Sequence, residues 1–461
     1  MASETDGCEV FSTRLAAAVL PVSATASRIS TWRKFSGIFK LEYPLYVSLI
    51  SEYTLVDAIL QQANEGGCMF ETDKAVGRRP LEGVRVLDFS RVLAGPYCTA
   101  LMADLGAEVI KVEPPAGDDY RHIGPFRDGE SLLFQSVNRG KKSIVLDLKS
   151  KEGAAAARAL AAECDVLVEN FRPGVMERFG LGAEMLCAAC PRLVYVSVSG
   201  FGQTGPNRMQ PAYDIIIQAM SGLMDMTGAE DGPPMMVGEA FADVAGGMFA
   251  AFGAMVALFD RSRSGRGRHV DLALYDSLVS MMPVAACRAL MAGEAPRRTG
   301  NKHALSAPFG AYSASDGGFT VAVLNDRLFA RFSAAIGAPG LADDPRFASD
   351  ALRRQNEPAL AQHIECWAAA RTAQDAVAVL SEAGIPAAAL CSVSEAWGSP
   401  QAQARGLTSA VEHPALGTVT VPEQPVHFSG APRGGRQPAP ALGAHTQDIL
   451  QQLRHKQGEP R

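Results

Sequence analysis

Residues 83–113 decide the fold of this chain, and they read Gly83-Val84-Arg85-Val86-Leu87-Asp88-Phe89-Ser90, a turn with Gly95-Pro96, a helical stretch over 97–105, and Ala107-Glu108-Val109-Ile110-Lys111-Val112-Glu113. The two short valine-rich runs predict strands, and the stretch between them predicts a helix. Strands joined in this way lie parallel, and a parallel sheet binds its ligand at the carboxyl ends of its strands. The sequence therefore predicts an α/β domain with its site at that edge.

The turn between these two strands differs from a dinucleotide-binding loop. Glu113 stands about 20 residues beyond the turn, where such folds place a ribose-binding acid. However, the turn reads Arg91-Val92-Leu93-Ala94-Gly95-Pro96 instead of G-x-G-x-x-G, and Pro96 lacks a backbone N–H. We therefore expect no NAD site.

The alternation of strands and helices continues for about 120 residues. Further strands are predicted at 143–148, 165–170 and 193–199, with a helix at 151–164. This pattern predicts a Rossmann-like, doubly wound large domain over 79–290 together with 425–461. Basic residues gather near the expected strand ends and form either a solvated surface or a groove for a phosphorylated, adenine-bearing ligand. They are Arg121, Arg139, Lys141, Lys142, Lys149, Arg172 and Arg178.

The composition changes after a strand at 269–273, and a second, smaller α/β domain is predicted at 295–405. Its predicted elements are a strand at 318–323 and helices at 326–336 and 357–383. Prolines and glycines then predict a linker at 406–424 that returns to the large domain, which ends in a helix at 446–453. Residues 1–78 lack this alternation and are predicted as an N-terminal appendage with one helix at 46–62.

The charge, the apolar runs and the cysteines of the sequence limit which partners and which cellular compartment are expected. A net charge of −6 argues against nucleic acid or an anionic membrane as the main partner. No apolar run reaches the length of about 18 residues that a membrane span needs. Nine scattered cysteines fit reduced thiols, and no histidine or cysteine spacing suggests a metal site. We expect a cytoplasmic protein without a tightly bound cofactor, or a mitochondrial one if residues 1–78 are a transit segment.

One carboxylate stands in an apolar stretch of the large domain: Val237-Gly238-Glu239-Ala240-Phe241-Ala242-Asp243-Val244-Ala245-Gly246-Gly247-Met248. The apolar run at 248–258 predicts a buried helix that begins near Asp243. At that end Asp243 either caps the helix, which is the more frequent role, or acts as a nucleophile beside glycines that admit an acyl group. In both roles the helix N-terminus is expected to keep Asp243 ionised.

Eight sequence blocks, in order, resemble the class III CoA-transferase family, which includes formyl-CoA:oxalate and carnitine CoA-transferases and acyl-CoA racemases. The blocks are Arg91-Val-Leu-Ala-Gly-Pro96, Gly106-Ala-Glu-Val-Ile-Lys-Val-Glu113, Asn138-Arg-Gly-Lys-Lys-Ser-Ile144, Val168-Glu-Asn-Phe-Arg-Pro-Gly174, Gly200-Phe-Gly-Gln-Thr-Gly-Pro206, Tyr213-Asp-Ile-Ile-Ile-Gln-Ala219, Ala242-Asp-Val-Ala-Gly-Gly247 and Gly265-Arg-Gly-Arg-His-Val-Asp271. The resemblance covers about residues 80–455. It also implies an interlocked homodimer.

The resemblance makes Asp243 the nucleophile that attacks an acyl-CoA. A carboxylate that attacks a thioester gives a mixed anhydride and releases CoA thiolate, and an ionised aspartate needs no base to do so. The acceptor acid then frees the first acid and CoA returns through an aspartyl thioester, in an order that varies within the family. Backbone N–H groups near Gly246 and Gly247 are expected to hold the oxyanion.

The resemblance also implies the contacts with acyl-CoA. Tyr213 matches a residue that lines the acyl site. The CoA contacts map to Val92, Leu93, Leu146, Asp147, Leu148, Lys149, Asn170, Phe171, Arg172 and Arg178. Leu93 and Pro211 depart from the formyl-CoA enzymes, which argues against formyl or oxalate specificity. The Arg91-Val-Leu-Ala-Gly-Pro96 block is more similar to relatives that use dicarboxylates such as succinate or glutarate.

Transfer of CoA to a free carboxylic acid is favoured over two alternatives. A racemase of this family pairs its aspartate with a histidine in a Gly-His-Asp motif, whereas this chain has Ala212-Tyr213-Asp214. Tyrosine, with an ordinary pKa of about 10, is a poor general base at neutral pH. A non-catalytic CoA-binding protein would not need Asp243, yet the motif around Asp243 is intact.

Overall fold

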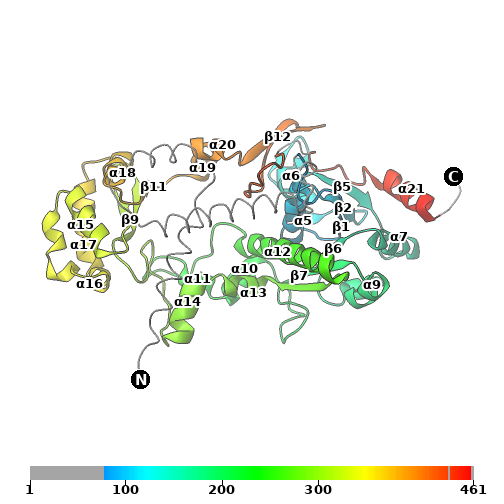
Figure 1. Ribbon diagram of the computed structural model, residues 1–461, viewed down its shortest axis with the longest axis horizontal. Coiled ribbons are helices and arrows are strands. Elements are labelled where there is room, and N and C mark those ends of the chain that lie inside the picture. The colour runs from blue at the N-terminus through cyan, green and yellow to red at the C-terminus, as the bar shows by residue number, and fades with distance from the viewer. Residues whose placement is uncertain (1–76, 434–436, 458–461) are drawn as a thin grey trace, which may run out of the picture. The chain divides into compact units, whose positions relative to one another are not determined.

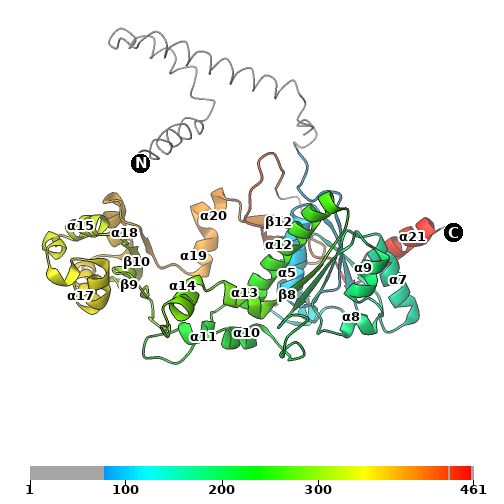
Figure 2. The same ribbon diagram turned by 60° about the horizontal axis from the view of Figure 1, so that its bottom comes forward.

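The computed structural model describes residues 77–433 and 437–457. The predicted helix at 46–62 and the transit-segment interpretation lie outside the described residues. Six parallel strands form a central sheet in the order β5-β2-β1-β6-β7-β8 (Figures 1 and 2). They are β1 (Arg85–Asp88), β2 (Glu108–Glu113), β5 (Lys141–Val145), β6 (Val166–Glu169), β7 (Val194–Ser199) and β8 (His269–Ala273).

The order of the strands locates the ligand site. Counted along the chain, the six strands lie in the order 3-2-1-4-5-6, so the winding of the chain reverses between β1 and β6. This is the strand order of dinucleotide-binding sheets, whose ligands lie in the crevice at the reversal. The predicted α/β class with a parallel sheet is confirmed.

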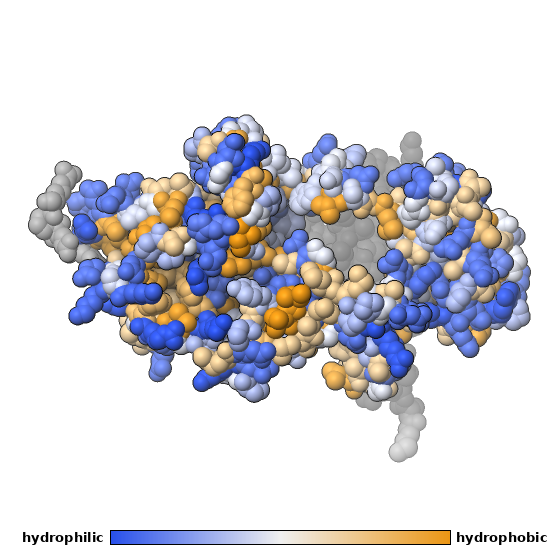
Figure 3. Space-filling view, turned by 180° about the vertical axis from the view of Figure 1, so that it is seen from behind, coloured by the Kyte–Doolittle hydropathy of each residue, from blue (hydrophilic) through white to orange (hydrophobic). Residues whose placement is uncertain are grey.

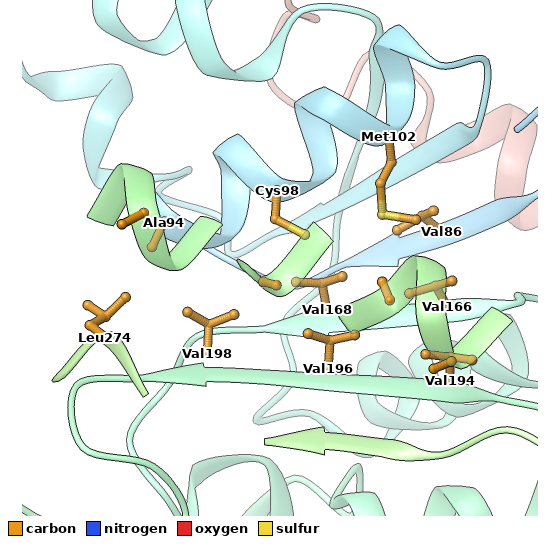
Figure 4. Packing of buried hydrophobic residues seen from close by; sticks show 14 of the residues in the cluster. Val86, Ala94, Cys98, Met102, Val166, Val168, Val194, Val196, Val198 and Leu274 are labelled. Carbon is orange, nitrogen blue, oxygen red and sulfur yellow. The ribbon is translucent and has the colours of Figure 1, made fainter. Parts of the chain in front are cut away.

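Helices cover both faces of this sheet, and each face has its own apolar core (Figure 2). One face packs against α5 (Ala94–Asp104) and α12 (Phe241–Ser264). The other packs against α7 (Lys151–Ala162), α9 (Ala183–Ala189) and α21 (Thr446–Gln457). Alternate residues of a strand enter opposite cores, and Figure 4 shows Val168 and Val196 facing Cys98 of α5. Continuous apolar strands are therefore required here.

Most of the basic residues predicted near the strand ends form ion pairs rather than a groove. The pairs are Lys141–Asp88 (3.0 Å), Arg139–Asp104 (2.5 Å), Arg121–Glu113 (2.7 Å) and Lys142–Glu108 (2.5 Å). All but the last have both partners largely buried, and a buried charge is tolerated only when it is paired. The groove prediction is therefore wrong for these four cations.

Residues 309–389 contain a three-stranded antiparallel sheet, ordered β11-β10-β9, with a core of its own. Its strands are β9 (Phe309–Ser313), β10 (Gly318–Ala322) and β11 (Ala387–Ala389), and its longer helices are α15 (Asp326–Ala335), α17 (Glu357–Ala368) and α18 (Ala373–Glu382). The single helix predicted at 357–383 is wrong. Thr372 has an extended backbone and caps α18 through its side chain, so the stretch forms two helices.

The segment predicted as a linker at 406–424 contains a hairpin of β12 (Thr408–His413) and β13 (Gly417–Pro422). Beyond the hairpin, the chain bonds to the large sheet: His445 N donates to Ser143 O, and Gly443 N donates to Ser143 Oγ. Shorter elements are α6 (Leu132–Asn138), α8 (Val175–Arg178), α10 (Asp214–Met220), α11 (Leu223–Met226), α13 (Leu274–Ser280), α14 (Pro283–Ala286), α16 (Asp350–Gln355), α19 (Val393–Gly398), α20 (Pro400–Ala404), and the hairpin of β3 (Phe126–Arg127) and β4 (Glu130–Ser131).

Among the described residues, one helix, α12, is long and apolar enough to span a membrane by length and composition. Its uninterrupted apolar run, between Asp243 and Asp260, is shorter than the run of about 18 residues that a membrane span needs. One side of α12 carries buried alanines and glycines that pack against α5 and the sheet. The other side exposes large apolar side chains, including Met248, Phe252 and Phe259. The packed side makes α12 a core helix of the large domain.

Candidate active site

A cavity of about 610 Å³ runs along the carboxyl ends of the strands of the large sheet. The segments that follow β5, β2, β1, β6, β7 and β8 all contribute to its lining, and so does the first turn of α12. The cavity therefore crosses the point at which the winding reverses, as the strand order requires.

Most of the residues implied by the sequence line this one cavity. They are Val92, Leu93, Leu146, Asp147, Leu148, Lys149, Asn170, Phe171, Arg172, Tyr213 and Asp243. Pro211 lines it as well. Three predicted residues lie outside the lining: Arg178, an exposed residue at the end of α8, and the two glycines of α12.

Gly246 and Gly247 serve the close packing of α12. A Cβ atom on Gly246 would lie 2.2 Å from Leu274 Cδ2, and one on Gly247 would lie 2.6 Å from the carbonyl oxygen of Ala94. Both glycines lie inside the helix, where their N–H groups bond to carbonyls one turn earlier. Those N–H groups are not free to bind the expected oxyanion. The glycines instead let α12 approach α5 and α13.

The loop after β1 is held in a fixed shape where it faces the cavity. The side-chain amide of Asn170 accepts from Arg91 N (2.8 Å) and donates to Arg91 O (2.7 Å), which joins the two strands at the winding reversal. Val92 has a left-handed backbone (φ 68°), which costs a β-branched residue about 1–3 kcal/mol. Its N–H donates to the buried Asp118 (3.1 Å), and Lys111 pairs with Asp118 at 2.7 Å. Sequence reasoning identified Asn170 but missed Asp118 and Lys111.

Asp243 is the third residue of α12, and the N-cap position is occupied by Ala240. The cap prediction for Asp243 is therefore wrong. Asp214, from the start of α10, supplies the capping acceptor: its Oδ1 accepts from Ala242 N (2.6 Å) and from Asp243 N (3.2 Å). This arrangement leaves the carboxylate of Asp243 free of the usual capping bond at the end of its own helix.

Burial and the neighbouring Asp214 raise the pKa of Asp243 to about 7. The expectation that the helix N-terminus keeps Asp243 ionised is corrected, because burial and a second carboxylate outweigh the helix. Tyr120 is near this pair, since burial and the charges of Asp243 and other acids raise its pKa to about 12. A carboxyl poised near neutral pH in a cavity is typical of a reactive group. No local sequence signal pointed to Tyr120.

The described residues place no histidine in the lining of the cavity. The position at which a racemase of the family would carry its histidine holds Tyr213, whose side chain is 70% exposed. Within 77–433 and 437–457, no group of three or more His, Cys, Asp or Glu side chains could hold a metal ion. The carboxylates in the lining of the cavity are those of Glu113, Asp119, Asp147 and Asp243.

Comparison with known proteins gives a consistent result. Residues 81–446 match CoA-transferase family III. The chain is 43% identical over 364 residues to an acetyl-CoA:oxalate CoA-transferase of Acetobacter aceti, which covers 78% of this chain and 92% of that protein. It is 39% identical to a succinyl-CoA:glutarate CoA-transferase of Mus musculus, over 82% of this chain and 88% of that one. A solved CAIB/BAIF family protein from Brucella suis is similar with a TM-score of 0.73 and 38% identity, over 82% of this chain and 100% of that chain.

The fold and the site define an α/β enzyme with the carboxyl group of Asp243 in a cavity that crosses the winding reversal of its sheet. The chain belongs to CoA-transferase family III. The activity predicted from the sequence, transfer of CoA from an acyl-CoA to a free carboxylic acid, is confirmed, and acyl-CoA is a substrate.

Proposed function

We propose that this enzyme transfers CoA to a short dicarboxylic acid with Asp243 as its nucleophile. The observation that carries the proposal is that Asp243 and two basic residues, Lys149 and Arg172, line one cavity. The cavity extends from Lys149, which follows β5, to Ser199 at the end of β7, four strand spacings or about 19 Å away, and Arg172 follows β6 between them. An extended CoA fits this length, with its phosphates at Lys149 and Arg172 and its thioester at Asp243.

Lys149 and Arg172 are suited to bind phosphates because neither cation has an ion-pair partner among the described residues. Lys149 and Arg172 are exposed, and in the described part of the chain neither forms an ion pair. This contrasts with Lys141 and Arg139, whose charges are satisfied inside the protein. A cation without an internal partner can bind a phosphate without breaking an existing bond.

The chemistry follows from the carboxylate. Ionised Asp243 attacks the thioester carbon, a C–O bond forms, the C–S bond breaks, and CoA leaves as thiolate with a mixed anhydride on Asp243. The thiolate then attacks the aspartyl carbonyl, which frees the first acid and gives an aspartyl-CoA thioester. The acceptor carboxylate attacks this thioester and displaces CoA as thiolate. The thiolate then attacks the acyl carbon of the acceptor, which gives the acceptor's CoA thioester and regenerates Asp243.

The dicarboxylate assignment is supported by the relatives, whose names specify oxalate, glutarate and D-citramalate. Leu93 and Pro211, the two departures from the formyl-CoA enzymes, both line the cavity. Purified enzyme with acetyl-CoA or succinyl-CoA should transfer CoA to succinate or glutarate faster than to acetate or butyrate. A preference for monocarboxylates would refute the assignment.

We also propose a homodimer, interlocked as in the family. α12 exposes Met248, Phe252 and Phe259, and Leu290 and Met291 are each 84% exposed. Figure 3 shows apolar patches on one face of the molecule. Large exposed apolar surfaces mark protein–protein contacts. Light scattering should give the mass of two chains, and Phe252→Asp, which puts a charge on this surface, should shift the mass toward one chain.

The role of Asp243 is tested by trapping. Incubation with acyl-CoA and hydroxylamine should convert Asp243 to a hydroxamate, detected by mass spectrometry of the peptide. Asp243→Ala should show neither the adduct nor transfer, whereas Asp231→Ala, which removes an exposed carboxylate, should retain both. Full transfer activity in Asp243→Ala would exclude the proposed nucleophile.

A further inference from the structure

Gln218 is a fully buried polar residue of α10 that lies next to the capping aspartate. Its Nε2 donates to Asp214 Oδ2 (2.6 Å) and to the backbone carbonyl of Glu239 (3.2 Å). Its Oε1 accepts from Val237 N (2.9 Å). One side-chain amide thus joins the start of α10 to the segment that leads into α12.

These bonds continue to the nucleophile itself. Asp214, held by Gln218 through Oδ2, uses Oδ1 to accept from Ala242 N and Asp243 N. Hydrogen bonds therefore run without a gap from Gln218 to the backbone of Asp243. The bonds from Gln218 to Val237 N and Glu239 O hold the backbone of the segment that leads into α12.

Other hydrogen bonds of the segment before α12 lie at Met235, whose N–H donates to Thr227 O (3.0 Å), and at Ala240, whose N–H donates to Glu239 Oε1 (2.9 Å). Residues 233–236, 238 and 239 are exposed, and Ala240 at the N-cap has no side chain that could cap the helix. A helix start without its own cap needs an acceptor from elsewhere. Asp214 is that acceptor, and Gln218 is the group that orients it.

We propose that Gln218 is a positioning residue for the nucleophile: it holds Asp214 against the N-terminus of α12, so that Asp243 is free of the cap and faces the cavity. The inference rests on the proposed role of Asp243 and deepens it. Only an amide serves here, because the site needs a donor toward Asp214 and Glu239 and an acceptor toward Val237. Leucine would fill the volume but would remove the hydrogen bonds to Asp214 Oδ2, Glu239 O and Val237 N.

The consequence is a defect in catalysis rather than in binding. Gln218 does not line the cavity, and Lys149 and Arg172, the proposed phosphate contacts, lie on other elements. Gln218→Leu should lower kcat about 10- to 100-fold, since misplacement by about 1 Å can have this effect. It should leave the KM for acyl-CoA within about threefold. Gln218→Glu adds a charge beside Asp214 and should move the acidic limb of the pH–kcat profile to higher pH.

The experiment compares the full-length wild type, Gln218→Leu, Gln218→Glu, and Gln355→Leu as a matched control on the exposed surface of α16. Rates are expressed per active site, counted by the amount of acylated Asp243 trapped at saturation, so that loss of folded protein does not count as slower turnover. The proposal is supported by reduced kcat with nearly constant KM in Gln218→Leu and by a shifted pH profile in Gln218→Glu. It is overturned if kcat per site stays within about threefold, or if Gln218→Glu leaves the profile unmoved.

Asp243→Ala, measured in parallel, separates the two hypotheses. Activity in Asp243→Ala would remove the proposed function, and with it the basis for a positioning residue. An inactive Asp243→Ala beside a Gln218→Leu enzyme of normal kcat would remove the positioning role alone.

Discussion

Replacing Asp243 with Asn should stabilise the protein above neutral pH while abolishing CoA transfer. The ordinary pKa of an aspartic acid, 3.8, is raised to about 7 in the folded protein by burial and Asp214. The folded state therefore binds this proton more tightly than the unfolded state. Stability is lost as pH rises from 3.8 to about 7, and the loss is complete above that range.

The size of the effect follows from the shift. Each pKa unit corresponds to about 1.4 kcal/mol, so ionising Asp243 lowers the free energy of unfolding by about 4 kcal/mol at pH 8. At pH 5 the folded carboxyl is still protonated, and the loss is about 2 kcal/mol. Asn has nearly the same volume and carries no charge, so Asp243→Asn should recover these amounts as upper bounds. The gain should grow by about 2 kcal/mol between pH 5 and pH 8.

The assay is urea or thermal unfolding of the wild type and Asp243→Asn at pH 5, 6.5 and 8. Asp231→Asn, at an exposed position, serves as the control and should show no such pH dependence. The expected result is a midpoint difference that widens with pH. A difference that is equal at all three pH values, or a less stable variant at pH 8, would refute the reasoning from burial and Asp214.

Further predictions address the pH dependence of the rate, the two proposed phosphate-binding cations and the packing of α12. In the wild type kcat/KM should rise with pH around an apparent pKa of about 7, and Asp214→Asn should move this midpoint to lower pH because it removes the second charge. Lys149→Ala and Arg172→Ala should each raise the KM for acyl-CoA about tenfold, with a smaller effect at high salt, whereas Arg178→Ala, outside the cavity, should not. Gly247→Ala should destabilise the protein by about 1–3 kcal/mol in urea unfolding, because its Cβ would meet the carbonyl of Ala94 at 2.6 Å. Unchanged KM in both basic variants, or a stable Gly247→Ala protein, would contradict these assignments.

The sheet was predictable at β1, β2, β6 and β7 because these strands are buried on both faces. Such strands appear as short apolar runs between helices, and β1, β2, β6 and β7 begin and end close to the predicted residues. β5 begins at Lys141, two residues before the prediction, because lysines obscure the apolar pattern. The acid that neutralises Lys141 is Asp88, 53 residues earlier, and no local pattern reveals that pairing.

The site was predictable in its members but not in their interactions. Asp243 and the cavity residues are recognisable by motif, whereas the cap that Asp214 provides joins residues 28 and 29 positions apart. A lone aspartate near a helix start predicts a cap by frequency, and only the fold shows that another residue performs that role. Likewise, the paired glycines suggested an approach for an acyl group, yet their neighbours are Leu274 and Ala94.

Ionised Asp243 lowers the stability of the folded protein and is also the proposed nucleophile. These two properties have one physical origin. Its carboxylate lies in a partly buried site beside Asp214, which itself occupies N–H groups at the start of α12. The ionised form is therefore raised in free energy relative to a carboxylate in water. When it attacks a thioester, the charge leaves with the CoA thiolate and the anhydride on Asp243 is neutral, so the unfavourable burial and repulsion are relieved. Part of the stability that Asp243→Asn would recover is thus the same free energy that favours acylation in the wild type.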